Sequence, residues 1–134
     1  MDTERASVLP VGVLMQPDFV AVEPWDTIGE AAEKMSELNV GSALVIDAGQ
    51  LVGILTSRDL LRAIAGRTHS SEARVREWMT PDPRVAQLDT PAAEAALMMV
   101  EQGCHHLPVV KGGRPIGVVG MRSVVEETFE SVLF

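Results

Sequence analysis

Two side chains with hydrogen-bonding capacity stand three positions apart in the segment Gly53-Ile-Leu-Thr56-Ser-Arg-Asp59-Leu60. The pattern places Thr56 and Asp59 where an apolar strand passes into a helix. An ionised carboxylate can accept bonds from both hydroxyls of a ribose, and a threonine hydroxyl can add one more. The same spacing also describes a capping box, in which both side chains bond the first turn of a helix. The two interpretations are compatible, and both remain open from these residues alone.

A histidine pair, His105 and His106, directly precedes the apolar segment 107–110. Neighbouring residues of a strand point to opposite faces, so the two imidazoles need not reach one ligand. The single cysteine, Cys104, rules out a cysteine-based metal cage, and His69 in a polar segment is a weak third ligand. We therefore predict no metal site. The ordinary alternative for each histidine is a satisfied surface or core residue.

The charge balance limits the classes of partner. The chain of 134 residues carries 11 Lys and Arg against 19 Asp and Glu, a net charge of −8. This charge opposes nucleic-acid binding, so an anionic ligand needs a local group of cations. Arg122, which opens the last expected helix, is one such cation, and its ordinary alternative is a surface ion pair with Glu126. No membrane span or signal peptide is recognisable, so we expect a cytoplasmic location.

The elements that must position these residues occur twice. Shifting the chain by 64 residues aligns Met15-x-Pro17 with Met79-x-Pro81, and Gly53 with Gly117. Many further matches share this register, which indicates a duplication. We expect an N-terminal extension over residues 1–10 and a first repeat over 11–66. A polar linker over 67–74 then leads to a second repeat over 75–134.

Each repeat has the pattern β-α-β-β-α after a short apolar turn (Val11–Met15 or Val75–Met79). The expected helices are 27–38, 57–65, 91–102 and 121–133, and the expected strands are 20–22, 42–47, 51–55, 85–86, 107–111 and 115–119. Turns containing glycine at 47–50 and 111–114 predict hairpins. One repeat is too small for a stable core, so the predicted fold class is α/β, an α+β sandwich whose two sheets pack together.

This arrangement resembles a tandem pair of cystathionine-β-synthase (CBS) domains over residues 11–130. The two Met-x-Pro motifs, the junction Glu101–Val109 and the segment Gly53–Leu60 carry the resemblance. The last segment is similar to the family's Gly-h-h-Thr/Ser-x-x-Asp nucleotide motif, in which h is apolar. The resemblance implies a Bateman module, in which two repeats pack sheet to sheet about a pseudo-two-fold axis. It also implies that adenosyl ligands bind in clefts between the repeats.

The resemblance assigns a role to each candidate residue. Thr56 and Asp59 would bind the ribose, and the cations His105, His106 and Arg122 would bind the phosphate. The adenine slot would consist of Val20, Ala21, Val22, Val40 and Ile54, for which core packing is the alternative. A second, weaker site would lack the carboxylate, the threonine and the histidines, and would consist of Gly41, Ser42, Arg58, Gly120 and Ser123.

The expected function is that of a stand-alone regulatory module that binds AMP, ADP or ATP and signals to an unknown effector protein. No catalytic motif is visible, so we expect neither an enzyme nor a required cofactor. A homodimer is expected, with the apolar segment Phe129–Phe134 as dimer contact or as a segment docked on its own chain. The alternatives are an interaction or dimerisation module with vestigial pockets, and a sensor of S-adenosylmethionine or NADH.

Overall fold

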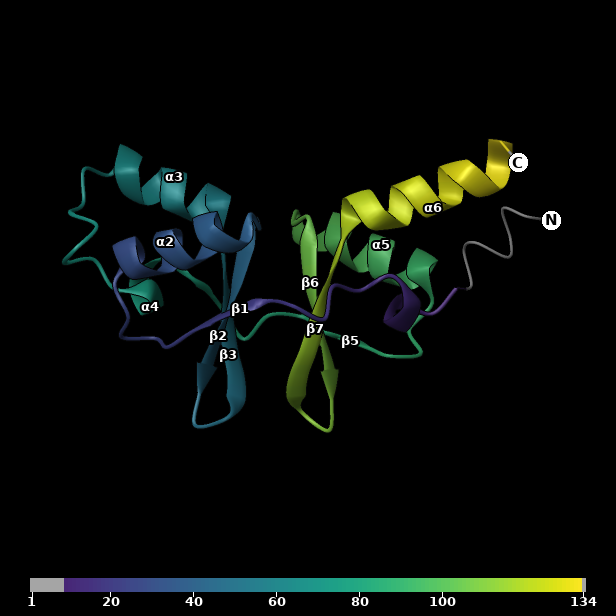
Figure 1. The fold of residues 1–134 in the computed structure, drawn as a ribbon, viewed down its shortest axis with the longest axis horizontal. Coiled ribbons are helices and arrows are strands. Elements are labelled where there is room, and N and C mark those ends of the chain that lie inside the picture. Colours follow the sequence, from purple (N-terminus) through teal and green to yellow (C-terminus); the bar gives the residue numbers. More distant parts are fainter. Residues whose placement is uncertain (1–8, 134) are drawn as a thin grey trace. The chain divides into compact units, whose positions relative to one another are not determined.

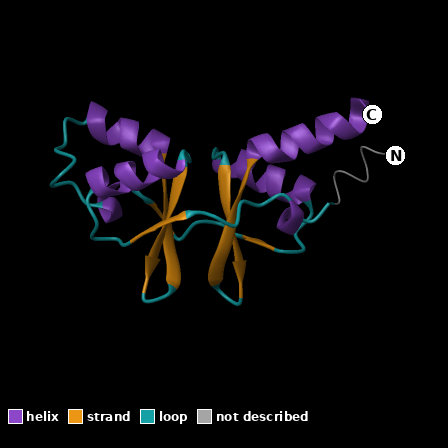
Figure 2. Ribbon diagram, in the orientation of Figure 1, coloured by secondary structure: helices purple, strands orange, loops and turns teal. Residues whose placement is uncertain are grey.

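The computed structural model describes residues 9–133, of which 128–133 are described by their backbone alone. The chain divides into two compact units. Residues Asp18–Pro83 form the central unit, and the described parts of Met1–Pro17 and Arg84–Phe134 form the terminal unit. In each unit the helices gather on one side of a small sheet (Figures 1 and 2). The predicted α+β fold class is confirmed, and the predicted contact segment Phe129–Phe134 lies outside the residues whose side chains are described.

The central unit is a four-stranded sheet with three helices. Its elements are β1 (Val20–Val22), α2 (Ile28–Leu38), β2 (Ser42–Asp47), β3 (Gln50–Thr56), α3 (Ser57–Ala65), α4 (Val75–Trp78) and β4 (Thr80–Pro81). The strand order is β1-β2-β3-β4, with β1 parallel to β2 and the other neighbours antiparallel. The short strand β4 was not predicted, because two residues carry no periodic signal.

Helix α2 buries the face that its apolar spacing predicts. Ile28, Ala31 and Met35 are buried in the core with residues of β1, β2 and β3. The helix begins at a capping box in which the amide of Glu30 donates to the hydroxyl of Thr27. It ends at Asn39, whose φ of 56° is left-handed, as is common after the last helical turn.

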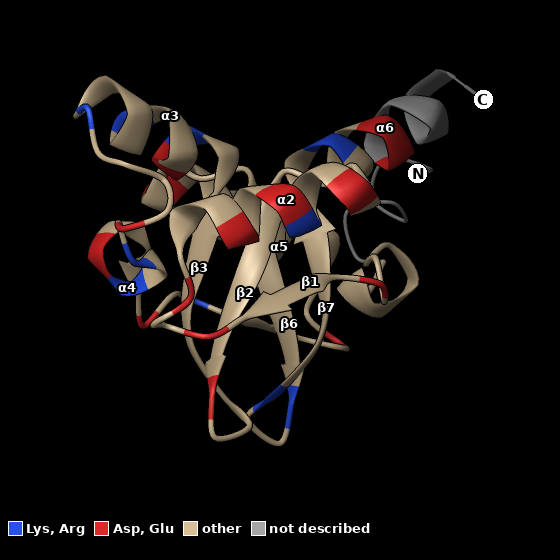
Figure 3. Ribbon diagram, turned by 60° about the vertical axis from the view of Figure 1, so that its left-hand side comes forward, with Lys and Arg blue, Asp and Glu red and all other residues tan. Residues whose placement is uncertain are grey.

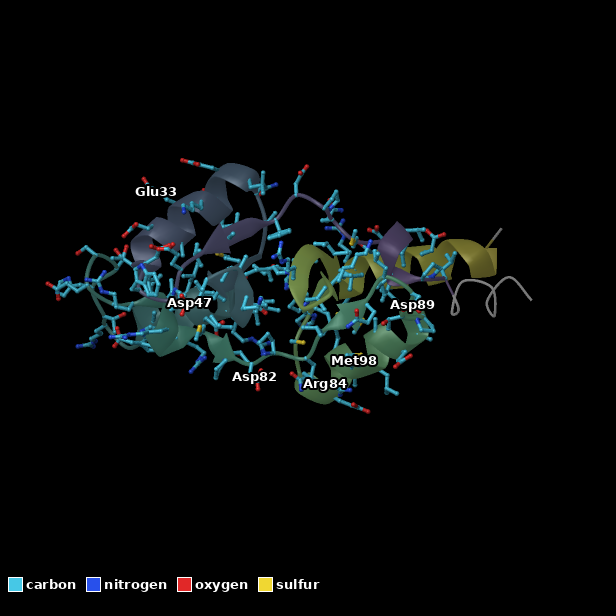
Figure 4. The ribbon with its side chains drawn as sticks, turned by 90° about the horizontal axis from the view of Figure 1, so that it is seen from below. Glu33, Asp47, Asp82, Arg84, Asp89 and Met98 are labelled. Atoms are coloured by element: carbon cyan, nitrogen blue, oxygen red, sulfur yellow. The ribbon has the colours of Figure 1, made fainter. Side chains whose placement is uncertain are left out.

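The terminal unit repeats this plan with a three-stranded sheet. Its elements are the 3-10 turn η1 (Val11–Val13), β5 (Ala86–Gln87), α5 (Ala92–Gln102), β6 (His106–Lys111), β7 (Arg114–Gly120) and α6 (Met121–Leu133). Strand β5 is parallel to β6, and β6 is antiparallel to β7. Arg84, labelled in Figure 4, lies in the loop before β5. It pairs with Glu101 of α5 at 2.8 Å.

Both hairpins turn through two residues with positive φ. In the central unit Ala48 has a φ of 52° and Gly49 one of 79°, and in the terminal unit Gly112 and Gly113 have 58° and 79°. Two left-handed residues match the twist of the strands they join, and glycine adopts this conformation without strain. The turn between β6 and β7 is flanked by Lys111 and Arg114, whereas β2 ends at Asp47, so the hairpins differ in charge (Figure 3).

The opening segment of each repeat packs in the unit that contains the rest of the other repeat. Gln16 exchanges two backbone hydrogen bonds with Val118 of β7, at 2.7 and 3.0 Å. In the central unit, β4 pairs with β3 through Gly53 and Pro81. The sequence repeat and the packing unit are therefore different divisions of the chain.

Candidate functional site

Thr56 and Asp59 form a reciprocal capping box at the start of α3. The backbone amide and the hydroxyl of Thr56 donate to Asp59 Oδ2, at 2.9 and 3.1 Å. The amide of Asp59 donates back to Thr56 Oγ1 at 3.3 Å. The capping interpretation is thus realised in the structure, and the carboxylate is buried, with 5% of the residue exposed.

The second carboxylate oxygen of Asp59 has a partner that the sequence analysis did not name. Arg62 Nη1 donates to Asp59 Oδ1 at 3.0 Å. The guanidinium carbon of Arg62 lies 5.7 Å from the ring centroid of Trp78, on α4. The spacing of Asp59 and Arg62 on one helix was a signal for the ion pair. The contact with Trp78 had no such signal, because α4 follows a loop.

Residues of the two predicted sites meet within the central unit. Ser42 of β2 lies opposite Thr56 of β3, and the amide of Ser57 donates to the carbonyl of Gly41 at 3.0 Å. Ser42 is buried, whereas Arg58 is exposed on α3. The structure therefore brings Gly41 and Ser42, assigned to the weaker site, to the same junction as the proposed ribose residues.

The terminal unit has the equivalent junction. His106 of β6 lies opposite Gly120 of β7, and the amide of Met121 donates to the carbonyl of His105 at 2.9 Å. Arg122 and Ser123 follow in the first turn of α6. The three predicted phosphate ligands thus belong to one unit, together with Gly120 and Ser123, whereas the predicted ribose ligands belong to the other unit.

The two histidines differ in environment, as neighbours on a strand should. His105 is exposed and His106 is half-buried. Burial lowers the pKa of His106 below its usual value of 6.5, and the neighbouring His105 lowers it further. A half-buried neutral imidazole is therefore the resting form of His106 near neutral pH.

Arg122 forms the surface ion pair with Glu126 that is its ordinary alternative to ligand binding. Its Nε donates to Glu126 Oε1 at 3.0 Å, and its side chain is 91% exposed. Exposed pairs of this kind are weak, so an anionic ligand could take the guanidinium from Glu126 at little cost.

The predicted adenine slot is largely core. Val20 and Val22 are buried in the cluster that joins β1 to α2, and Val40 is packed against it. Ile54 is also buried, and Ala21 is exposed. Core packing, the alternative considered for these positions, is confirmed for the three valines.

A pocket of about 620 Å³ opens at the hairpin end of the central unit. Its lining residues are Ala21, Val22, Glu23, Asp26, Lys34, Ile46, Ala48 and Gly49. It shares Ala21 and Val22 with the predicted slot, but it lies at the end of β2 opposite to Ser42 and Thr56. Figure 3 shows mixed charges along α2, which supplies Lys34. No sequence pattern indicated this pocket, because its wall depends on how the turn folds beside α2.

Two absences concern only the part of the chain that the structure describes. Among residues 9–127, whose side chains are described, no group of three His, Cys, Asp or Glu side chains could hold a metal ion. Over the same residues, none of the helices combines the length and apolar character required to cross a bilayer.

Comparison with known sequences identifies the repeats. The family model for the CBS domain matches residues 11–66 and again 75–130. A 17.7 kDa protein of Acidianus ambivalens, in the bps2 3′ region, is 39% identical over 105 residues, covering 77% of this chain and 63% of its own length. MJ1225 of Methanocaldococcus jannaschii is 32% identical over 82% of this chain and 39% of its own length. MK0525 of Methanopyrus kandleri is 29% identical over 87% of this chain and 61% of its own length, so this chain spans only part of these relatives.

Solved structures share the fold over most of the chain. The CBS domain NE2398 is 30% identical with a TM-score of 0.82, over 90% of this chain and 97% of its own. The CBS domain pair of MJ0100, crystallised with 5′-methylthioadenosine and S-adenosyl-L-methionine, is 26% identical with a TM-score of 0.80, over 87% of this chain and 97% of its own.

Proposed function

This chain belongs to the CBS-domain family, and on that premise we propose that it is a regulatory module whose ligand is an adenine nucleotide. The MJ0100 pair supports an adenosine-derived ligand, because both compounds in its crystals contain an adenosyl group. The side chains of His105, His106 and Arg122 can donate hydrogen bonds to a 5′-phosphate, which favours AMP, ADP or ATP as the ligand.

The observation that carries the proposal is the state of the Thr56–Asp59 pair. An ionised carboxylate offers about four acceptor positions, and three are used here, two on Oδ2 and one on Oδ1. One position on Asp59 Oδ1 is left. Thr56 Oγ1 donates one bond and accepts one, so one of its lone pairs is also left. We infer that Asp59 and Thr56 each accept a hydrogen bond from one of the two ribose hydroxyls.

The proposal assigns the phosphate to His105, His106 and Arg122. These residues supply cationic or hydrogen-bonding groups in a chain with a net charge of −8. The residues assigned to the weaker site, Gly41, Ser42, Arg58, Gly120 and Ser123, include no carboxylate, so we propose one competent site per chain. A homodimer and a protein effector complete the proposed regulatory role.

Isothermal titration with AMP tests the site. Asp59→Ala should weaken AMP binding by about tenfold or more, because a hydrogen bond to a charged group is worth about 1.5–3 kcal/mol. Ser123→Ala is the change at the position equivalent to Asp59 in the other repeat, and this variant should bind AMP with the affinity of wild type. An unchanged affinity in Asp59→Ala would refute the assignment, and a loss confined to Ser123→Ala would move the ligand to the weaker site.

One observation favours the alternative of an interaction module without ligand. Capping and Arg62 together supply partners to both oxygens of Asp59, and no buried side-chain polar atom among the described residues lacks a partner. Thermal unfolding with adenosine, AMP, ADP, ATP, NADH and S-adenosylmethionine separates the two functions. A ligand present at 100 times its Kd adds about 2.7 kcal/mol to the stability. No shift with any compound would favour the interaction module.

A further inference from the structure

The buried carboxylate of Asp59 is bound on its outer side by an exposed arginine. The side chain of Asp59 is 7% exposed and that of Arg62 is 61% exposed, and their atoms Oδ1 and Nη1 are 3.0 Å apart. Both hydrogen bonds that the carboxylate accepts from the cap reach Oδ2. Arg62 is therefore the one described hydrogen-bond partner of Oδ1.

Trp78 limits the movement of Arg62. The indole lies against the C-terminal half of α3, since its Cη2 atom would be 3.3 Å from a Cβ at Gly66. The guanidinium lies 5.7 Å from the centre of the same ring. A planar guanidinium can rest on an aromatic face and donate from its edge to a carboxylate at the same time. The indole and the carboxylate together hold a long side chain that solvent exposure would otherwise leave free.

We propose that Arg62, held on the face of Trp78, is a positioning residue that fixes Asp59 Oδ1 for a ribose hydroxyl. The inference rests on the proposed function of Asp59. Without Arg62, the carboxylate keeps its capping bonds to Oδ2 but loses the contact that directs the free lone pair of Oδ1. Arg62 then contributes to affinity without itself touching the ligand, and Trp78 contributes through Arg62.

The test compares adenosine with 2′-deoxyadenosine and 3′-deoxyadenosine by isothermal titration. In wild type, removing the hydroxyl that Asp59 accepts should weaken binding by about tenfold or more. Arg62→Gln should weaken adenosine binding about five- to thirtyfold and reduce this discrimination to within about threefold. Trp78→Leu should likewise lower the affinity for adenosine and the discrimination against its deoxy analogues. Trp78→Phe keeps an aromatic face, so its affinity and discrimination should be close to those of wild type.

Arg76→Ala is the matched control, because Arg76 is an exposed arginine of α4 that forms no ion pair among the described residues. The Arg76→Ala variant should have the same affinity for adenosine and the same discrimination against the deoxy analogues as wild type. A double variant, Arg62→Gln with Trp78→Leu, should be no worse than Arg62→Gln alone, because Trp78 acts through Arg62. Thermal unfolding of each variant shows that the folded protein is being titrated.

Two failures can be told apart. If Asp59→Ala leaves adenosine affinity unchanged, the proposed function of this site fails, and the inference fails with it. If Asp59→Ala weakens binding but Arg62→Gln keeps the discrimination between adenosine and its deoxy analogues, then only the positioning role is refuted. A loss of affinity in Arg62→Gln with unchanged discrimination also refutes it, since that is what a merely structural role produces.

Discussion

The sulfur of Met79 lies directly over the backbone of Gly53, and an ideal Cβ at residue 53 would be 2.5 Å from Met79 Sδ. The terminal unit repeats the relationship, with Met15 Sδ 2.7 Å from the Cβ position of Gly117. Each methionine opens a Met-x-Pro motif, and each glycine lies in the third strand of a β-α-β-β-α repeat. The glycines therefore make room for the segment that each repeat exchanges with the other.

Gly53→Ala and Gly117→Ala should each destabilise the protein by about 1–3 kcal/mol, because a methyl group enters occupied space. Gly117→Ala should cost more, since the backbone carbonyl of Gln16 is 2.8 Å from its Cβ position, whereas the nearest backbone carbonyl at Gly53, that of Thr80, is 3.0 Å away. Urea unfolding measures both. In a double-mutant cycle, Met79→Ala should lessen the cost of Gly53→Ala, and strict additivity would contradict the proposed contact.

Ala48→Gly should stabilise the protein by about 0.5–1 kcal/mol. Alanine at a φ of 52° is strained, and glycine relieves the strain at a smaller cost in chain entropy. The equivalent residue of the other hairpin is already glycine, so Gly112→Ala is the reciprocal control and should destabilise. Thermal unfolding of both variants decides, and a lower Tm for Ala48→Gly would contradict the strain argument.

Thr56→Ala and Thr27→Ala remove the same kind of cap from α3 and α2. Each should cost about 0.5–2 kcal/mol of stability. Only Thr56→Ala should also weaken adenosine binding, because only Thr56 has been assigned to the ribose. Unfolding and titration on the same samples separate the two effects. Equal affinities for the two variants would leave Thr56 with a capping role alone.

His106 should make the fold less stable as the pH falls below about 6.5. Its pKa is lowered in the folded state, so the unfolded chain takes up the proton first, and the stability that the neutral imidazole contributes is lost as pH decreases. His106→Gln should remove this part of the acid dependence of the unfolding free energy. Parallel slopes for wild type and variant between pH 7 and about pH 5 would contradict the lowered pKa.

The histidine pair should also set the response to phosphate. AMP should bind more tightly than adenosine, because a protonated imidazole attracts the phosphate. This preference for AMP should increase as the pH falls and decrease at high salt. The double change of His105 and His106 to Ala should remove the pH dependence and most of the preference, while adenosine still binds. Tighter binding of S-adenosylmethionine than of AMP would defeat the phosphate assignment, since its sulfonium is cationic.

Local patterns were sufficient for the longer elements of this protein, but not for the two-residue strand β4. The predicted strand 42–47 and the predicted helices 57–65 and 121–133 coincide with β2, α3 and α6, because apolar periodicity and glycine turns act over a few residues. The capping alternative for Thr56 and Asp59 was equally local, since a three-residue spacing at a helix start defines it. The same holds for the ion pair of Arg122 with Glu126.

Tertiary structure alone decided which distant segments pack together. The sequence established that Met15 and Met79 are equivalent, but equivalence does not say that each packs on the glycine of the other repeat. That exchange depends on the path of the chain and on the space above Gly53 and Gly117. The placement of Trp78 beside Arg62 has the same origin, because a loop separates α3 from α4 and side-chain contacts across a loop follow no period.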